Sequence, residues 1–323
     1  MEIQEIAQVA AELRANMAKV IVGKDDTVDL MLIAMIASGH ILLEDVPGTG
    51  KTLLAKTMAA SLDCTFRRVQ FTPDLLPSDL TGIHFYNQKE GEFEFREGPL
   101  FANLILADEI NRATPRTQSS LLECMEERQI SVDGHTHELK KPFIVIATQN
   151  PVDNQGTFPL PEAQMDRFML KMSMGYPTQE ESVEILRRTI SGNFITGVSA
   201  VVAQRDIVAA QSVYTAVRVQ EDLMRYIIAI ADATRHHPDI ALGVSPRGTQ
   251  ALLKAAQARA AIQGREYVLP DDIKALALPV LSHRLVFKHR SKQQEGKAEA
   301  LLSDIISQIP VPSDRTSVES SVQ

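Results

Sequence analysis

The stretch LLEDVPGTGKTLLAK, residues 42–56, decides how this chain folds. The segment HILLE before it is typical of a strand, and the segment KTLLAKTMAAS is typical of a helix. This order matches the phosphate-binding loop G-x-x-x-x-G-K-[ST], with one exception. Gly50, Lys51 and Thr52 stand in their usual positions, but Asp45 replaces the first glycine. The loop is therefore either a nucleotide site with a variant entrance or a glycine-rich turn that binds nothing.

The residue types of the loop favour a nucleotide site. Gly48 and Gly50 let backbone N–H groups face an anion at the start of a helix, where the helix dipole attracts negative charge. We expect Lys51 to pair with the β and γ phosphates and Thr52 to offer its hydroxyl to Mg²⁺. Asp45 lies where the strand leaves the sheet, so we expect it to alter the entrance of the loop and to leave its function intact.

A second motif supports the first. The segment NLILADEINRA is an apolar strand that ends in Asp108 and Glu109. Asp108 is expected to hold Mg²⁺ through water, and Glu109 to polarise the water that attacks the γ-phosphate. The alternative is a solvated acidic strand end. Both motifs together, in this order, predict a nucleotide hydrolase.

Two further polar residues are candidates for the site. Asn150 ends the apolar segment FIVIATQNP and could sense the γ-phosphate, or it could simply form an Asn-Pro turn. Arg247 follows Ser245, a predicted N-cap, and Pro246, a typical first helical residue. A cation there opposes the helix dipole at a cost of up to about 1 kcal/mol, which a bound anion would offset. The alternative is a solvated arginine.

Two more arginines could act between subunits. Arg167, in PLPEAQMDRFML, is predicted to start the last strand of the first domain. It could pair with Asp166 or Glu162, or it could reach a neighbouring subunit's phosphate as an arginine finger. Arg112, just after the acidic pair, is the second candidate for such a contact.

The first half of the chain alternates helical and strand-like segments. Apolar positions at helical spacing predict helices over residues 3–20 and 25–38. Further on, strands are expected at residues 40–44, 66–71, 104–107, 143–147 and 168–172, with helices at 51–61 and 115–128. This order predicts an α/β fold with a parallel sheet covered by helices, and ligands at the carboxyl ends of the strands.

Two inserts and a change of pattern complete the organisation. Hairpins are predicted near residues 83–96 and 130–139, the second around Asp133-Gly134. After residues 175–177 the pattern is almost entirely helical, with helices expected at 179–189, 205–216, 221–235, 246–262, 270–281 and 298–308. We therefore predict an α/β domain over residues 1–175, a smaller all-α domain over 176–310, and a disordered tail over 311–323.

The composition disfavours several classes of protein. The 323 residues carry a formal net charge of −8, which disfavours a protein that coats nucleic acid or an anionic membrane. Two cysteines, Cys64 and Cys124, form no CxxC motif, which suits a reducing compartment. The N-terminus is acidic and no apolar run is long enough to span a bilayer, so we expect a cytoplasmic protein with no membrane span.

Five phrases together resemble the MoxR family of AAA+ ATPases. They are LLEDVPGTGKT, QFTPDLLPSDLTG, GPLFANLILADEINRATPRTQSSLLECMEERQISVDG, ATQNPVDNQGTFPLPEAQMDRF and GVSPRGTQALLKAAQARA, and the resemblance runs from about residue 20 to about residue 285. It implies a P-loop αβα core, a helical lid and hexameric rings. Asp45 looks like a common variant within that family, so it does not count against the site.

The resemblance also implies roles for individual residues. Lys51 and Thr52 would belong to Walker A, Asp108 and Glu109 to Walker B. Asn150 would be the sensor-1 residue, Arg167 the finger and Arg247 the sensor-2 arginine. The catalytic set would be Glu109, Lys51, Asn150, Arg167 and Arg247, and Mg²⁺ would be held by Thr52 and Asp108. ATP would be bound by Val22, Gly23, Pro47, Gly48, Thr49, Gly50, Lys51, Thr52, Leu53 and Arg247, with Val22 and Gly23 nearest the adenine.

The same resemblance implies a chaperone-like role on a client protein, often with a partner that carries a von Willebrand factor A domain. Two other functions are considered. A nucleic-acid motor is disfavoured by the net charge and by the few cations in the hairpin turns. An ATP-binding scaffold without hydrolysis is disfavoured by Glu109, because a scaffold needs no general base.

Overall fold

The computed structural model describes residues 1–150, 156–190, 198–289 and 296–312. Its centre is a five-stranded sheet with the strand order β2-β5-β8-β1-β9, in which every neighbouring pair is parallel. The strands are β1 (Ile41–Glu44), β2 (Phe66–Gln70), β5 (Leu104–Asp108), β8 (Ile144–Gln149) and β9 (Leu170–Met172). The predicted parallel sheet is confirmed.

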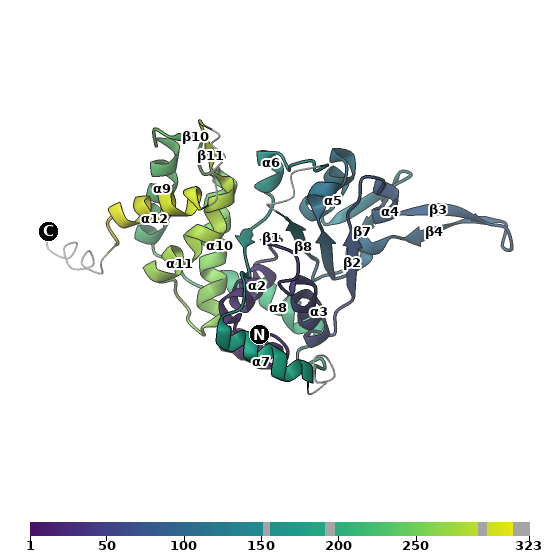
Figure 1. The fold of residues 1–323 in the computed structure, drawn as a ribbon, viewed down its shortest axis with the longest axis horizontal. Helices are drawn as coiled ribbons and strands as arrows, with labels where there is room; N and C mark the ends of the chain where they lie inside the picture. Colours follow the sequence, from purple (N-terminus) through teal and green to yellow (C-terminus); the bar gives the residue numbers. More distant parts are fainter. Residues whose placement is uncertain (151–155, 191–197, 290–295, 313–323) are drawn as a thin grey trace, which may run out of the picture.

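Helices cover both faces of this sheet (Figure 1). Those that matter here are α1 (Ile3–Ala18), α2 (Asp25–Ile36), α3 (Lys51–Ser61), α4 (Pro77–Thr81) and α5 (Pro115–Glu127). Strand side chains alternate between two clusters, as the pleat requires. Leu43 packs with α1, α2 and α3, whereas Leu42 packs with α4 and α5. The αβα core is therefore confirmed.

The start of the last strand differs from the prediction. Pairing of β9 with β1 begins at Leu170, so Arg167 precedes the strand. The short helix α6 (Glu162–Met165) ends just before it, and the backbone N–H of Arg167 still donates to Gln164 O at 3.2 Å. The chain is turning at Arg167, and the apolar residues after it made the strand look longer than it is.

Both predicted hairpins are present. The first consists of β3 (Gly82–Asn87) and β4 (Glu92–Glu97), and the second of β6 (Gln129–Val132) and β7 (His135–Glu138). They contact each other: the ring of Phe95 stacks on His137 with centroids 4.4 Å apart, and His84 Nδ1 lies 2.9 Å from Asp133 Oδ2. The β3–β4 hairpin projects well away from the body of the protein (Figure 1).

The C-terminal half is helical, as predicted. It contains α7 (Gln179–Ile190), α8 (Gln204–Val213), α9 (Glu221–Arg235), α10 (Pro246–Ile262), α11 (Pro270–Leu281) and α12 (Lys297–Gln308). It also has a small antiparallel sheet of β10 (Ile240–Leu242) and β11 (Val286–Phe287), so this half is not purely helical. Strands of two or three residues are too short to show a period in the sequence.

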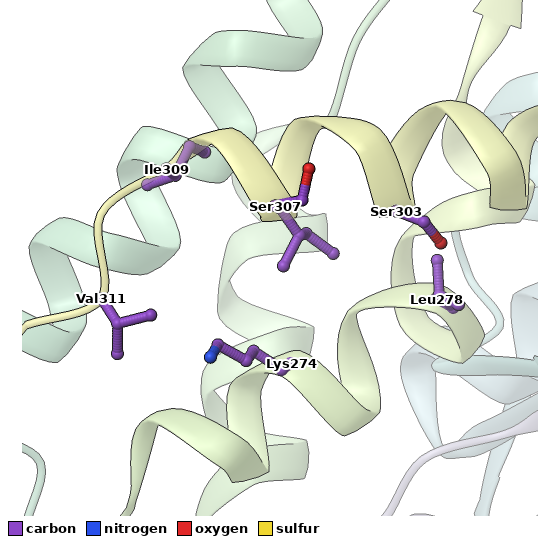
Figure 2. Close-up of a pocket in the computed structure, with 7 residues that line it drawn as sticks. Lys274, Leu278, Ser303, Ser307, Ile309 and Val311 are labelled. Atoms are coloured by element: carbon purple, nitrogen blue, oxygen red, sulfur yellow. The ribbon is translucent and has the colours of Figure 1, made fainter.

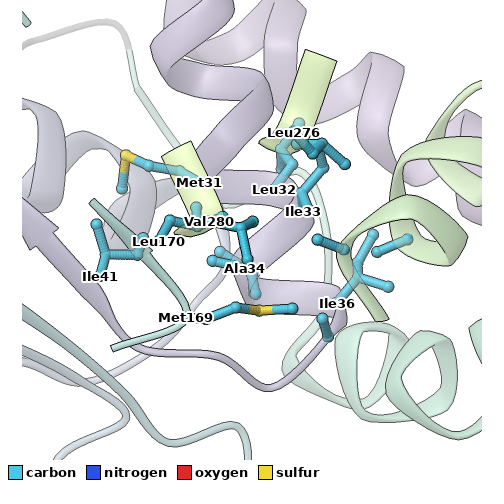
Figure 3. Packing of buried hydrophobic residues seen from close by; sticks show 14 of the residues in the cluster. Met31, Leu32, Ile33, Ala34, Ile36, Ile41, Met169, Leu170, Leu276 and Val280 are labelled. Atoms are coloured by element: carbon cyan, nitrogen blue, oxygen red, sulfur yellow. The ribbon is translucent and has the colours of Figure 1, made fainter. Parts of the chain in front are cut away.

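One hydrophobic cluster joins the two halves of the chain. Leu32 and Ile33 of α2 lie beside Leu276 of α11, and Leu170 of β9 belongs to the same cluster (Figure 3). The boundary near residue 175 therefore stays a prediction. Beyond residue 312 the predicted tail lies outside the described residues. Within the described parts of the chain, no helix is long and apolar enough to cross a membrane.

Candidate nucleotide site

The phosphate loop forms an open cradle at the start of α3. Gly48 and Gly50 have φ angles of 85° and 94°, in the left-handed region that favours glycine. A Cβ at Gly48 would meet no heavy atom within 4 Å, and one at Gly50 would meet only Met174 Cε, at 3.8 Å. Lys51 Nζ donates to the carbonyl oxygens of Asp45 and Val46 at 2.9 and 3.0 Å. The open backbone, the helix N-terminus and the lysine fit a chain of phosphates.

Asp45 ties the loop to the segment after β9. Its side chain is buried, and Oδ1 accepts from the N–H of Val46 at 3.1 Å. Oδ2 accepts from the N–H groups of Met174 and Gly175 at 2.6 and 3.2 Å. A glycine at position 45 could not make these contacts. The variant residue thus connects the entrance of the loop to the chain that leads into α7.

The acidic pair at the end of β5 is fixed by a residue that the sequence did not reveal. Thr148, near the end of β8, donates from Oγ1 to Asp108 Oδ1 at 2.6 Å and accepts from the N–H of Glu109 at 2.8 Å. Arg68 of β2 donates to Asp108 Oδ2 at 2.6 Å. The sequence signal was weak: Thr148 is a polar residue inside an apolar strand, and only the strand order places it beside Asp108.

Glu109 lies at the same edge of the sheet. Its Oε2 accepts from Gln70 Nε2 at 2.7 Å and lies 3.1 Å from Arg112 Nε. Arg112 therefore sits beside the acidic pair of its own chain. Asn150 directly follows β8, which lies between β5 and β1 in the sheet. The structure thus brings the phosphate loop, the acidic pair and Asn150 to one edge, where a nucleotide and Mg²⁺ could be held together.

Arg167 and Arg247 lie at the opposite edge. Arg167 precedes β9, at the amino end of the sheet, where the N–H of Met169 donates to His40 O at 2.8 Å. Arg247 Nη2 donates to Glu126 Oε1 at 2.7 Å. Glu126 follows Met125, whose carbonyl contacts the ring of His40 at 3.1 Å. These arginines are separated from the phosphate loop of their own chain by the length of strand β1, which rises by about 3.3 Å per residue.

A partly buried network holds the second edge together. Ser245 is the N-cap of α10, and its Oγ accepts from the N–H of Gly248 at 3.1 Å. The same Oγ donates to Asp166 Oδ2 at 2.9 Å, and Asp166 Oδ1 lies 2.7 Å from Arg284 Nε. Asp166 therefore pairs with Arg284. The pairing of Asp166 with Arg167, which was one of the alternatives predicted for Arg167, is not formed in the described part of the chain. The network also places the start of α10, with Arg247, next to the turn that carries Arg167.

The start of α7 covers the segment assigned to adenine. Gly23, next to Val22, has a φ of 65°, and a Cβ there would collide with the carboxylate of Glu181. Lys24 Nζ donates to Tyr176 O at 3.3 Å. Tyr176 and Glu181 were not predicted as site residues, because only the fold brings them to this segment.

The cysteines do not compete with this site. Burial raises the pKa of the Cys64 thiol to about 11 and that of Cys124 to about 12. Both thiols therefore stay protonated near neutral pH, and neither acts as a thiolate nucleophile.

Two cavities lie near the helical half. One of about 1150 Å³ extends between α2, α11 and α12, and its wall includes Glu44 and Lys171, whose side chains pair at 2.7 Å. Since Glu44 precedes Asp45, this cavity adjoins the phosphate loop. The other, of about 320 Å³, lies between α11 and α12 (Figure 2). Its wall includes Lys274, Ser303 and Ser307 but none of the predicted site residues, so we assign no chemistry to it.

Known proteins resemble this chain along most of its length. Residues 40–170 match the ATPase family associated with various cellular activities, AAA, and residues 232–305 match the AAA lid domain. The chain is 49% identical to the uncharacterised protein YeaC of Bacillus subtilis, over 93% of this chain and 94% of that protein. It is 39% identical to Chaperone MoxR1 of Mycobacterium tuberculosis, over 91% of this chain and 80% of the other.

Two further similarities cover nearly the whole chain. Protein MoxR of Paracoccus denitrificans is 32% identical over 93% of this chain and 96% of its own length. A crystal structure of a proposed ATPase from Cytophaga hutchinsonii superposes with a TM-score of 0.86 at 40% identity, covering 96% of both chains.

Proposed function

The chain belongs to the MoxR family of AAA+ ATPases, and from this premise we propose that it hydrolyses ATP with Mg²⁺ to remodel or mature a client protein. The observation that carries the proposal is the meeting of Lys51, Thr52, Asp108 and Glu109 at one edge of the sheet, with Thr148 bonded to the acidic pair. Nucleotide binding in general is already implied by the match to the AAA ATPase family.

Each residue of this edge has a role in the proposal. The backbone of the loop and Lys51 would hold the phosphates. Thr52 and Asp108 would hold Mg²⁺, which when bound neutralises charge on the phosphate oxygens. Glu109 would orient the attacking water. Thr148 would keep the carboxylate of Asp108 turned toward the metal and the backbone of Glu109 in place.

The proposal includes assembly into a ring, hexameric by resemblance. In one chain, Arg167 and Arg247 lie at the edge of the sheet away from the phosphate loop, so we expect them to serve a nucleotide on a neighbouring copy. Head-to-tail contact would place both arginines of one copy against the phosphates of the next. In this arrangement Arg247 of one copy would contact the nucleotide of the next copy and not that of its own chain. A cytoplasmic location and a partner with a von Willebrand factor A domain rest on resemblance and composition.

The β3–β4 hairpin supports a protein client over a nucleic acid. Tyr86 and Phe93 form a pair with centroids 5.3 Å apart, yet 53% and 72% of their surfaces are exposed. Four glutamates lie on the same hairpin: Glu90, Glu92, Glu94 and Glu97. Exposed apolar side chains suit contact with a protein surface, and the carboxylates around them repel the phosphates of a nucleic acid.

The test is ATP turnover per subunit against protein concentration, with Glu109→Gln as control. The proposal expects turnover that rises steeply with concentration and is lost in the control. Turnover that is flat with concentration would contradict the shared site. If ATP binds but is never hydrolysed, with or without client, the scaffold function holds instead. Turnover stimulated by DNA or RNA in a salt-dependent manner would support the nucleic-acid motor.

A further inference from the structure

The helix α7 carries an apolar stripe that faces outward. Val183, Leu186 and Ile190 follow the i, i+3, i+7 spacing of one helix face, and they are 43%, 62% and 87% exposed. None of the residues of α7 is buried. Single exposed apolar residues are common on proteins, but a stripe on one face of an amphipathic helix marks a contact surface.

The polar face of α7 is the one that holds it to the protein. Glu181, Glu184 and Arg188 share the side of the helix opposite the stripe. Arg188 Nη1 donates to the carbonyl oxygens of Ala18 and Lys19 at 3.2 and 2.8 Å. Glu181 lies 3.9 Å from Lys24 Nζ. The attachment of α7 is therefore polar, and its apolar side is left for a partner.

The stripe is close to the nucleotide edge. Met174 and Gly175 are bonded to Asp45 of the phosphate loop, and α7 begins at Gln179, a few residues further on. Glu181 in the first turn of α7 covers Gly23. A molecule that approaches the phosphates from outside would therefore pass beside α7.

The molecule expected there is a second copy of this chain. At the nucleotide edge the carboxylates of Asp108 and Glu109 contact Arg68 and Arg112 of the same chain, and bound phosphates would add negative charge there. The opposite edge carries Arg167 and Arg247. The bound phosphates would make the two edges complementary in charge, and the proposed site receives Arg167 and Arg247 only from another copy. A head-to-tail contact that joins the two edges would also cover the surface beside the nucleotide.

We infer that the stripe of Val183, Leu186 and Ile190 docks onto the neighbouring copy of this chain, on the edge that carries Arg167 and Arg247. This inference rests on the proposed function, because it takes the ring and the shared site as given. It adds the surface that supplies the apolar part of the interface.

The experiment compares full-length wild type with Leu186→Glu, using Met224→Glu as the matched control. Both substitutions put a glutamate in place of an exposed apolar residue, and Leu186→Glu keeps a good helix former. Met224 lies on the helix α9 and is 43% exposed. Assembly is measured by sedimentation with Mg²⁺ and ATP in a Glu109→Gln background, and turnover is measured in the hydrolysing background. Thermal unfolding and ATP binding at low concentration verify that each variant is folded.

We expect Leu186→Glu to raise the concentration for half-maximal assembly and turnover by at least about tenfold. High protein concentration should restore its turnover, whereas Arg167→Ala should stay defective at every concentration. Met224→Glu should assemble like wild type. If the variant at 186 does not bind ATP, Ile190→Glu takes its place.

Two results would overturn the inference, and they differ. If wild type assembles and hydrolyses ATP while Leu186→Glu and Ile190→Glu assemble equally well, the stripe is not the interface and the proposed function stands. If wild type stays monomeric with Mg²⁺ and ATP, the ring itself is wrong, and the inference fails with it.

Discussion

The carboxylate of Asp45 accepts a hydrogen bond of 2.6 Å from the backbone N–H of Met174. The first residue lies in the phosphate loop and the second at the point where the chain leaves the sheet for the helical half. Asp45, which departs from the usual loop pattern, is thus the residue that joins the loop to the segment where the chain leaves the sheet. Because the acceptor is buried, the contact is not readily replaced by water.

Replacing Asp45 tests this connection. Asp45→Gly restores the usual loop pattern, so we expect ATP to bind. It leaves the buried N–H of Met174 without its acceptor, and the free energy of unfolding should fall by about 1–3 kcal/mol. The turnover rate should fall by a larger factor than the affinity for ATP, because the phosphate loop is no longer coupled to the segment that follows β9. Urea unfolding, ATP titration and steady-state kinetics measure the three effects.

Asp45→Asn is the matched control for that change. It keeps one oxygen acceptor of the same size, so its stability should lie between those of wild type and Asp45→Gly. A glycine variant as stable and as active as wild type would show that the contact with Met174 has no part in the cycle.

Thr148 is predicted to be a positioning residue. Thr148→Val keeps the shape of the side chain but removes the hydroxyl that joins Asp108 to the N–H of Glu109. We expect kcat to fall by about 10- to 100-fold, in the range seen when groups that orient a metal ligand are lost. ATP binding without Mg²⁺ should change little, and the Mg²⁺ concentration for half-maximal turnover should rise.

Thr148→Ser separates the hydroxyl from the packing of the methyl group. The serine variant should retain most of the turnover and the Mg²⁺ dependence of wild type. Equal loss in the valine and serine variants would assign the effect to packing and would contradict the role proposed for the hydroxyl.

His40 makes stability depend on pH. Burial, and then the charge of Arg128, hold the pKa of His40 well below its usual value of about 6.5. Its Nδ1 accepts from the N–H of Val145 at 3.0 Å, so the folded protein keeps the ring neutral. The unfolded chain takes up the proton below about pH 6.5, and the folded chain does not. Stability therefore falls as pH is lowered, with a slope that approaches about 1.4 kcal/mol per pH unit below pH 6.5 for this residue.

Unfolding by urea at pH 7.5, 6.5 and 5.5 measures that slope. His40→Gln should remove the contribution of His40 and leave that of His283, whose pKa burial also lowers. A slope below pH 6.5 that is the same in wild type and in His40→Gln would contradict the assignment.

The periodicity of the sequence was enough to predict the central sheet and the longer helices, but not the short strands β10 and β11. The spatial order of the strands explains which contacts in the site it missed. Strands such as β5 and β8 are apolar on both faces, so their positions could be predicted. The contact of Thr148 with Asp108 depends on β8 lying beside β5, which the chain order does not specify. The direction of the α7 stripe was equally hidden, because an amphipathic pattern is the same whether its apolar face points inward or outward.

The placement of Arg167 across the sheet from Glu109 predicts recovery of activity on mixing. Arg167→Ala and Glu109→Gln should each be inactive alone, by about 10³-fold or more for the arginine. In a mixed ring, a chain with Arg167→Ala keeps its own Glu109 and can receive Arg167 from a neighbour. An equal mixture should therefore regain about a quarter of wild-type turnover if the copies assemble at random head to tail.

Two mixtures make this test specific. Lys51→Ala with Glu109→Gln should stay inactive, because both residues serve the same nucleotide and every site then carries a defect. Arg247→Ala with Glu109→Gln should recover as the Arg167 mixture does, since the pairing of Arg247 with Glu126 holds it at the same edge as Arg167. Recovery with Arg167→Ala but not with Arg247→Ala would mean that Arg247 leaves Glu126 and serves the phosphates of its own chain. The helical half would then have to swing over its own sheet during each cycle, which the network of Asp166, Ser245 and Arg284 resists.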